Sequence, residues 1–211
     1  MNDDQSVILR IDSSMRQEGS VSRLLADNVI STLHADLPDA EILLRDLKQG
    51  VGHVNSAWRA ASLENPGARS SEDRAILAQS DALKAEVERA DIIVLAVPIY
   101  NFSIPAALKA WVDMVCRNNV DGAAALSRRE PAYRKQAVVL LTSNHTLAGA
   151  KDEFATSFLK HILAFLGCSE INLVDSTGLA NDRAGVLSAA NERINDICRN
   201  VVSLNISAAA E

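Results

Sequence analysis

The strongest constraint on the fold is an unbroken run of apolar residues from Ile92 to Val97. A strand with one face in water alternates apolar and polar residues, whereas a strand of a parallel sheet is apolar throughout because helices cover both of its faces. The run therefore predicts a central strand of a parallel sheet. Other apolar runs bring the number of expected strands to five. Their expected ranges are 7–11, 42–44, 92–97, 137–141 and 171–174.

Segments with helical periodicity separate these strands. Residues 70–89, for example, begin with a capping-box pattern at Ser70 and Asp73 and continue with apolar residues at helical spacing. The other helices are expected at about 20–33, 105–115, 154–165 and 183–202, with short helical pieces within 49–69. Alternating strands and helices predict an α/β fold, a doubly wound five-stranded parallel sheet with helices on both faces, as one domain over residues 1–211.

The charge of the chain argues against a nucleic-acid partner. The formal net charge is −6 at pH 7 and the isoelectric point is about 5.3, so no strongly basic surface is expected. The N-terminus is acidic before its first apolar run, and no stretch of about 20 apolar residues is present. We therefore expect a cytoplasmic protein with no membrane partner. The three cysteines lie far apart, which predicts neither a metal site nor a disulfide framework.

Polar loops follow the first, third and fourth expected strands. The carboxyl ends of parallel strands meet at one edge of the sheet, and in the flavodoxin-like strand order 2-1-3-4-5 FMN binds between the first and third strands. The first loop carries Ser14, Ser20 and Ser22. Their hydroxyls, together with the amides of the following helical turn, suit a phosphate dianion. The same serines could also serve only to cap the helix.

The loop after the central strand combines aromatic rings with a carboxamide. Tyr100, Asn101 and Phe102 offer a flat, partly apolar wall at a strand end, which is typical of a ligand site. Ser103 is expected to cap the next helix, with Pro105 in its first turn. The sequence contains no Gly-x-Gly-x-x-Gly, P-loop or Gly-x-Ser-x-Gly pattern. A dinucleotide-binding Rossmann site, a P-loop and an α/β-hydrolase site are therefore not indicated.

The segment from Val97 to Asp113, VPIYNFSIPAALKAWVD, resembles the flavin loop of the FMN-dependent NADH:azoreductases, a quinone-reducing branch of flavodoxin-like enzymes. Further similarity lies in the serine loop, in residues 45–47, in residues 139–143 and in residues 165–167. The resemblance implies a homodimer with FMN at the subunit interface. It also implies the following cofactor-binding residues: Ser14, Ser20, Val21 and Ser22 at the phosphate and ribityl chain, and Ile99, Tyr100, Asn101 and Phe102 along the isoalloxazine ring, with Ser143, Asn144, His145 and Thr146 after the fourth strand.

Two segments depart from the family pattern. The family usually follows its fourth-strand Thr-Ser with an arginine or similar residue and two glycines, which let backbone amides approach the flavin. This chain has Asn144, His145 and Thr146 there, so we expect His145 to hydrogen-bond the flavin, to narrow the acceptor pocket, or to point into solvent. The family also has an aromatic loop before the fourth strand, whereas residues 118–135 contain only Tyr133 as an aromatic. Substrate stacking is expected to differ there.

The resemblance predicts an FMN-dependent oxidoreductase that transfers electrons from NADH or NADPH to quinones, azo compounds or both by a ping-pong mechanism. Such chemistry belongs to the cofactor and needs no side-chain nucleophile, so no catalytic residue is predicted. The alternative is a flavodoxin-like protein that binds FMN, or nothing, and acts as a regulatory or redox-sensing partner with little turnover.

Overall fold

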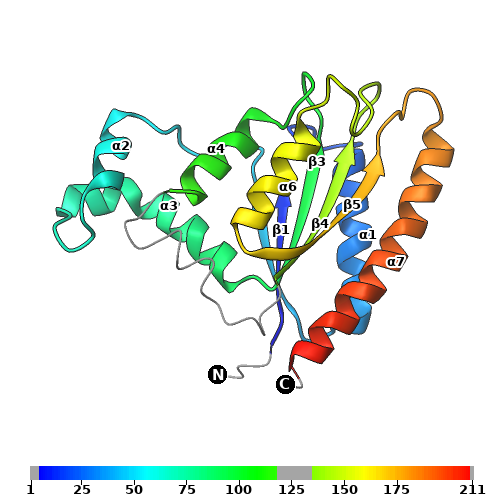
Figure 1. Ribbon diagram of the computed structural model, residues 1–211, viewed down its shortest axis with the longest axis horizontal. Helices are drawn as coiled ribbons and strands as arrows, with labels where there is room; N and C mark the ends of the chain where they lie inside the picture. The colour runs from blue at the N-terminus through cyan, green and yellow to red at the C-terminus, as the bar shows by residue number, and fades with distance from the viewer. Residues whose placement is uncertain (1–4, 118–134, 210–211) are drawn as a thin grey trace.

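The computed structural model describes residues 5–117 and 135–209. Its sheet has five parallel strands in the order β2-β1-β3-β4-β5, which confirms the flavodoxin-like prediction (Figure 1). β1 pairs with β3 from Ile8 opposite Ile92 to Asp12 opposite Ala96, so the carboxyl ends of these two strands lie side by side. The strands are β1 (Val7–Asp12), β2 (Glu41–Asp46), β3 (Ile92–Pro98), β4 (Lys135–Thr142) and β5 (Cys168–Ser176).

Helices cover both faces of the sheet. α1 and α7 lie on one face and α3, α4 and α6 on the other, while α2 extends to one side (Figure 1). Each predicted helix is present in the described residues, and α2 is the short helix expected within 49–69. The helices are α1 (Val21–Asp36), α2 (Ser56–Leu63), α3 (Ser71–Arg89), α4 (Ala106–Val115), α6 (Ala155–Phe165) and α7 (Arg183–Ala209).

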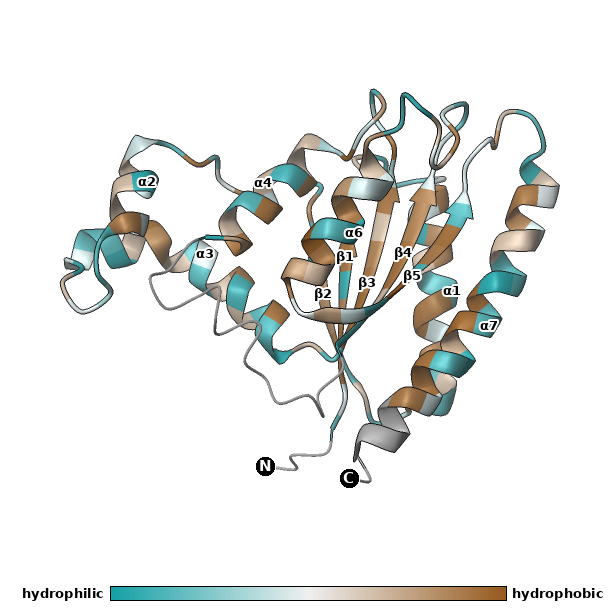
Figure 2. Ribbon diagram, in the orientation of Figure 1, coloured by the Kyte–Doolittle hydropathy of each residue, from teal (hydrophilic) through white to brown (hydrophobic). Residues whose placement is uncertain are grey.

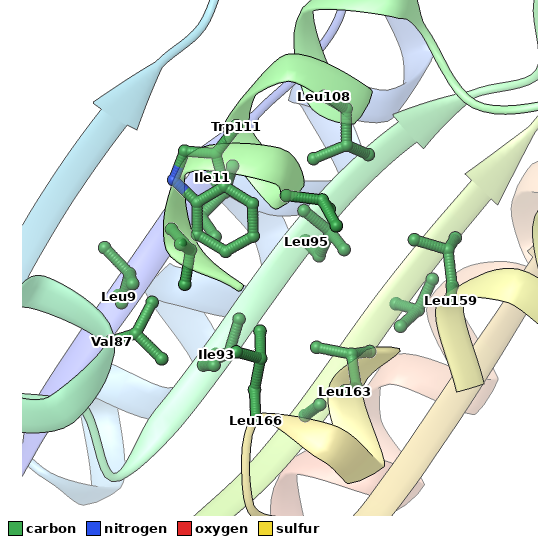
Figure 3. Packing of buried hydrophobic residues seen from close by; sticks show 14 of the residues in the cluster. Leu9, Ile11, Val87, Ile93, Leu95, Leu108, Trp111, Leu159, Leu163 and Leu166 are labelled. Carbon is green, nitrogen blue, oxygen red and sulfur yellow. The ribbon is translucent and has the colours of Figure 1, made fainter. Parts of the chain in front are cut away.

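The central strand contributes to two separate hydrophobic cores. Ile93 and Leu95 pack against α3, α4 and α6, where Trp111 fills much of the space between helix and sheet (Figure 3). Ile92 and Val94 point to the opposite face and pack against α1 and α7. Every residue of β3 is buried. The run is apolar throughout because successive side chains enter different cores, as the sequence predicted.

Figure 2 shows this distribution as hydrophobic strands between helices whose outer surfaces are largely hydrophilic. Hydrophilic residues also occur in the loops at the carboxyl ends of the strands, at the top of the same view. None of the helices in the described part of the chain is long and apolar enough to cross a membrane.

The predicted capping residue was confirmed at the start of one helix and was wrong at the start of another. The capping box of Ser70 and Asp73 is present at α3. The prediction that Ser103 caps α4 was wrong. Pro105 is the N-cap residue of α4, and Ser103 instead pairs with Tyr100 across a tight turn.

Candidate functional site

A cleft of about 300 Å³ lies at the carboxyl edge of the sheet, between the loops that follow β1, β3 and β4. It opens where the strand order reverses, since β1 lies between β2 and β3. Open α/β sheets bind their ligands at such a switch point. The volume is at the lower end of the range for small-molecule sites, which is roughly 300–1,000 Å³.

The first turn of α1 borders the cleft without a side-chain cap. Ser20 occupies the N-cap position, yet its side chain makes no capping hydrogen bond. Its hydroxyl instead lies 3.3 Å from the hydroxyl of Ser22, and both residues line the cleft. This first turn, which the structure describes completely, contains no acidic residue. Its free N–H groups and the positive end of the helix dipole are therefore available to an anion.

Arg23 holds the serine loop in place. Its guanidinium donates hydrogen bonds to the carbonyl oxygens of Ser14, at 2.8 Å, and Arg16, at 3.2 Å. The same guanidinium pairs with Asp46 at 2.7 Å and Asp12 at 2.9 Å, and the hydrogen bonds to Asp46 raise the pKa of Arg23. Because two carboxylates neutralise it, Arg23 orders the loop backbone and adds little positive charge to the cleft.

Hydrogen bonds join the first loop to the central strand and its loop. The backbone N–H and the hydroxyl of Ser13 both donate to the carbonyl oxygen of Ala96, at 3.1 and 2.7 Å. The hydroxyl oxygens of Ser14 and Tyr100 lie 3.5 Å apart. These contacts fix the relative position of the two loops that form the floor and one wall of the cleft.

The loop after β3 forms a two-residue turn with an unusual backbone. Tyr100 and Ser103 exchange backbone hydrogen bonds of 2.9 and 3.1 Å, and the residues between them, Asn101 and Phe102, have φ values of 48° and 69°. Two consecutive positive φ values are characteristic of a type I′ turn. Asparagine tolerates this conformation, but phenylalanine rarely adopts it. The turn leaves Asn101 and Phe102 exposed and outside the lining of the cleft.

The loop after β4 is held by its neighbours on both sides. Ile99 donates its N–H to the carbonyl oxygen of Thr142 at 2.8 Å, and the Ser143 hydroxyl donates to the carbonyl oxygen of Thr146. On the other side, the N–H groups of Leu179 and Ala180 donate at 3.1 Å to the carbonyl oxygens of Ser143 and Asn144. The fourth-strand loop and the connection from β5 to α7 therefore form one hydrogen-bonded unit.

The cleft is positively charged although the whole chain is acidic. Among the described residues, those that line it include Arg16 and Arg183 but no aspartate or glutamate. Such a lining favours an anionic ligand.

The structure places most of the predicted cofactor-binding residues around this one cleft. Asn101 and Phe102 are the exceptions, because the turn directs them outward. Substrate stacking was predicted to differ over residues 118–135, and of these residues 118–134 lie outside the described part of the chain. The predicted residues that line the cleft are Ser14, Ser20, Val21, Ser22, Ile99, Tyr100, Ser143, Asn144, His145 and Thr146.

Sequence reasoning missed several lining residues. Arg16 could have been found, since a cation within a serine-rich strand-end loop is itself a signal for an anion. Arg183 lies after the fifth strand, in a segment without any recognisable motif, so its place beside the first loop follows only from the folded chain. Pro98, Thr142 and Leu179 complete the missed set.

The cysteines do not contribute thiolate chemistry. All three are free, and burial raises the pKa of Cys116 to about 11 and those of Cys168 and Cys198 to about 12. These thiols stay protonated at neutral pH. Within residues 5–117 and 135–209, no group of three His, Cys, Asp or Glu side chains is arranged to hold a metal ion.

The family profile described as a flavodoxin-like fold matches residues 6–197. The chain belongs to this flavodoxin-like family. One relative, FMN-dependent NADH:quinone oxidoreductase 1 of Colwellia psychrerythraea, is 35% identical over 193 residues, which cover 89% of this chain and 97% of the relative. FMN-dependent NADH:quinone oxidoreductase of Thiobacillus denitrificans is 40% identical over 174 residues, covering 79% of this chain and 82% of the relative.

Solved structures with the same flavodoxin-like fold include azoreductases. An azoreductase from Bacillus anthracis has a TM-score of 0.76 at 16% identity, covering 94% of this chain and 100% of its own. An FMN-dependent NADH-azoreductase from the same species, solved in complex with FMN, has a TM-score of 0.77 at 17% identity, covering 94% of this chain and 99% of its own. At these identities the likeness establishes the fold.

Proposed function

We propose that this protein is an FMN-dependent oxidoreductase that transfers electrons from NADH or NADPH to quinones, azo compounds or both by a ping-pong mechanism. The observation that carries the proposal is the cleft at the switch point of the sheet, which joins the uncapped start of α1 to the Tyr100 loop and has no carboxylate among its described lining residues. The names of the relatives at 35% and 40% identity support FMN, NADH and a quinone as cofactor, donor and acceptor.

The two ends of the cleft fit the two ends of FMN. At one end, the hydroxyls of Ser20 and Ser22 and the free amides of the first turn of α1 suit the phosphate. At the other end, Ile99 and Tyr100 provide a partly apolar wall suited to a flat ring, and the loop from Asn144 to Thr146 faces it. The hydrogen bonds within and between these loops hold the shape of the cleft, which lowers the entropic cost of binding.

The residues of the cleft bind and orient, and they need perform no covalent step. FMN, when bound, supplies a ring that accepts a hydride from the reduced nicotinamide and delivers two electrons to the acceptor. Ser20, Ser22 and the amides of α1 would hold the phosphate, while Tyr100, fixed beside Ser14, would support the ring. Donor and acceptor would use the same open side of the cleft in turn, which is the basis of the ping-pong order.

A homodimer is part of the proposal because apolar side chains are exposed beside the cleft. Phe102 is 50% exposed, Phe154 60% and Leu147 53%, and all three belong to loops at the carboxyl edge of the sheet. A backbone hydrogen bond joins Phe102 to Phe154, and exposed apolar residues that gather on one surface mark interaction sites on soluble proteins. A second copy of the chain placed here would bury these residues and cover the open side of the flavin.

Two measurements on the purified protein test the proposal. Bound flavin should give an absorbance band at about 450 nm, and its absence after incubation with FMN would contradict the proposal. The flavin-loaded protein should oxidise NADH or NADPH when a benzoquinone or an azo dye is supplied. Flavin binding without turnover towards either acceptor would favour the alternative of a redox-sensing flavin binder.

A further inference from the structure

The positive charge of the cleft comes from two arginines that are distant in the sequence. Arg16 lies in the loop after β1, and Arg183 is the first residue of α7. Both side chains are exposed, and among the described residues neither has an ion-pair partner. Their charges are therefore available to a ligand.

The neighbouring arginines are not available in the same way. Arg10 pairs with Asp12 at 3.0 Å and with Asp27 at 2.5 Å. Arg23 pairs with Asp12 and Asp46, as described above. Each of these guanidiniums is neutralised within the protein. Among the described residues that line the cleft, the uncompensated positive charge therefore belongs to Arg16 and Arg183.

The position of Arg183 identifies the end of the cleft that it serves. With Ser20 and Val21 it also lines a second cavity of about 270 Å³ on the outer side of α1. Among the described residues, none from the loops after β3 and β4 lines this second cavity. Arg183 therefore lies near Ser20 and Val21, at the serine end of the main cleft.

The start of α7 is fixed in this position by the backbone. Leu179 and Ala180 are hydrogen-bonded to the loop after β4. Asp182, the acidic neighbour of Arg183, accepts a 2.9 Å hydrogen bond from the N–H of Gly185. This contact directs the Asp182 carboxylate to the helix start, where it caps the first turn of α7.

We propose that Arg183 binds the phosphate group of FMN directly, together with Ser20 and Ser22, and that the charge of Arg16 strengthens the attraction for the anion. The inference rests on the proposed function and deepens it by naming a phosphate ligand from the last helix. A guanidinium fork matches the geometry of phosphate oxygens and forms charge-assisted hydrogen bonds with them. The last helix of the chain thereby contributes to the same subsite as the first.

The test compares FMN with riboflavin, which has the same ring and ribityl chain but no phosphate. Dissociation constants of both flavins are measured by fluorescence quenching with the flavin-free full chain, for the wild type, Arg183→Gln and Arg183→Lys. Arg193→Gln is the matched control: it removes the same charge from an exposed position on the same helix, ten residues or about 15 Å further along.

We expect Arg183→Gln to weaken FMN binding about tenfold and to leave riboflavin binding unchanged, because only FMN carries the group that Arg183 contacts. Arg183→Lys keeps the positive charge without the guanidinium fork and should weaken FMN binding less than Arg183→Gln does. Arg193→Gln should change neither constant.

Three results would overturn the inference. These are an unchanged FMN constant in Arg183→Gln, an equal loss for FMN and riboflavin, and an equal effect of Arg193→Gln. If the wild type binds FMN and any of these results is found, only the role of Arg183 is overturned. A wild type that binds no FMN would overturn the proposed function as well.

Discussion

The N–H of Phe154 donates a 2.8 Å hydrogen bond to the carbonyl oxygen of Phe102, which joins the turn after β3 to the start of α6. Phe102 adopts a φ of 69°, a left-handed conformation that an L-residue rarely takes. The bond from Phe154 and the paired bonds of Tyr100 with Ser103 together hold this conformation. Strained residues of this kind are concentrated at functional sites. Here these hydrogen bonds hold an exposed aromatic ring on a loop next to the cleft.

Replacing Phe102 separates the strain from the role of the ring. Phe102→Gly and Phe102→Ala both remove the ring, but only glycine adopts a positive φ without steric cost. We therefore expect Phe102→Gly to be more stable than Phe102→Ala by about 1 kcal/mol in denaturant unfolding. Equal stability of the two variants would show that the left-handed conformation carries no cost at this position.

The exposed aromatic residues should mediate dimerisation. We expect a dimer at micromolar concentration in sedimentation velocity, and a monomer for Phe154→Glu, because burying a carboxylate at an apolar interface is costly. Phe165→Glu is the control, since Phe165 is also partly exposed but lies at the far end of α6, about 16 Å away. A monomeric wild type with full activity would contradict the dimer.

The hydroxyls at the start of α1 should contribute to phosphate binding. Changing Ser20 and Ser22 together to alanine removes two donors that cap nothing in the protein. If each makes a typical hydrogen bond, the loss is about 2 kcal/mol and the FMN dissociation constant rises about thirtyfold. Riboflavin titrations serve as the internal control. An unchanged FMN constant would show that the serines act only in the loop's own structure.

Glu153 links the loop after β4 to the start of α6. Its buried carboxylate accepts hydrogen bonds from the N–H groups of Gly149 at 2.9 Å, Thr156 at 2.8 Å and Ala155. Burial opposes ionisation of this carboxyl, but the hydrogen bonds from Thr156, Gly149 and Ala155 outweigh burial and lower the pKa of Glu153 below its ordinary value. The ionised form is therefore stabilised in the folded state.

Because the pKa of Glu153 is lowered in the folded state, the protein should lose stability as the pH falls through the acidic range. The contribution of the Glu153 carboxylate to the free energy of unfolding is fully present above the pKa of the unfolded state, about 4.3. It is lost as the pH falls through the lower pKa of the folded state. Glu153→Gln should be less stable than the wild type by about 1 kcal/mol at pH 7, and the difference should shrink as the pH falls below about 4. Urea unfolding at several pH values measures it. A difference that is independent of pH would show that the carboxylate charge is not involved.

The fold was predictable because its determinants are local. The apolar run of β3 and the capping box at Ser70 require only the order of neighbouring residues and the two periodicities of strand and helix. The cleft was predictable in outline, because parallel strands bring the loops after them to one edge. The sequence therefore indicated the serine loop and Tyr100 before their contacts were known.

Other features depend on contacts between distant parts of the chain. Arg23 orders the serine loop only because Asp46, from another strand, lies beside it, and Arg183 reaches the cleft only because α7 packs next to α1. The turn at Asn101 and Phe102 lacks the glycine that usually marks a type I′ turn, so its outward direction had no signal. The positions of these residues are set by tertiary contacts and not by the local sequence.

His145 is exposed, yet it lines the cleft on the loop after β4. That loop is held by the bond from Ser143 to Thr146 and by the bonds from Leu179 and Ala180, so its position does not depend on the imidazole. Replacing His145 should therefore change the space at the rim of the cleft and leave the loop in place.

We expect the His145→Gly substitution to favour bulky acceptors over compact ones. An added side chain excludes a large acceptor more than a small one, so the wild type should reduce compact benzoquinones well and extended azo dyes poorly. His145→Gly should raise the ratio of kcat/KM for an azo dye to that for a benzoquinone by about tenfold. His161→Ala, which changes an exposed histidine within α6, is the control and should leave the ratio unaltered. An unchanged ratio in His145→Gly at equal FMN occupancy would show that the imidazole lies outside the acceptor's path.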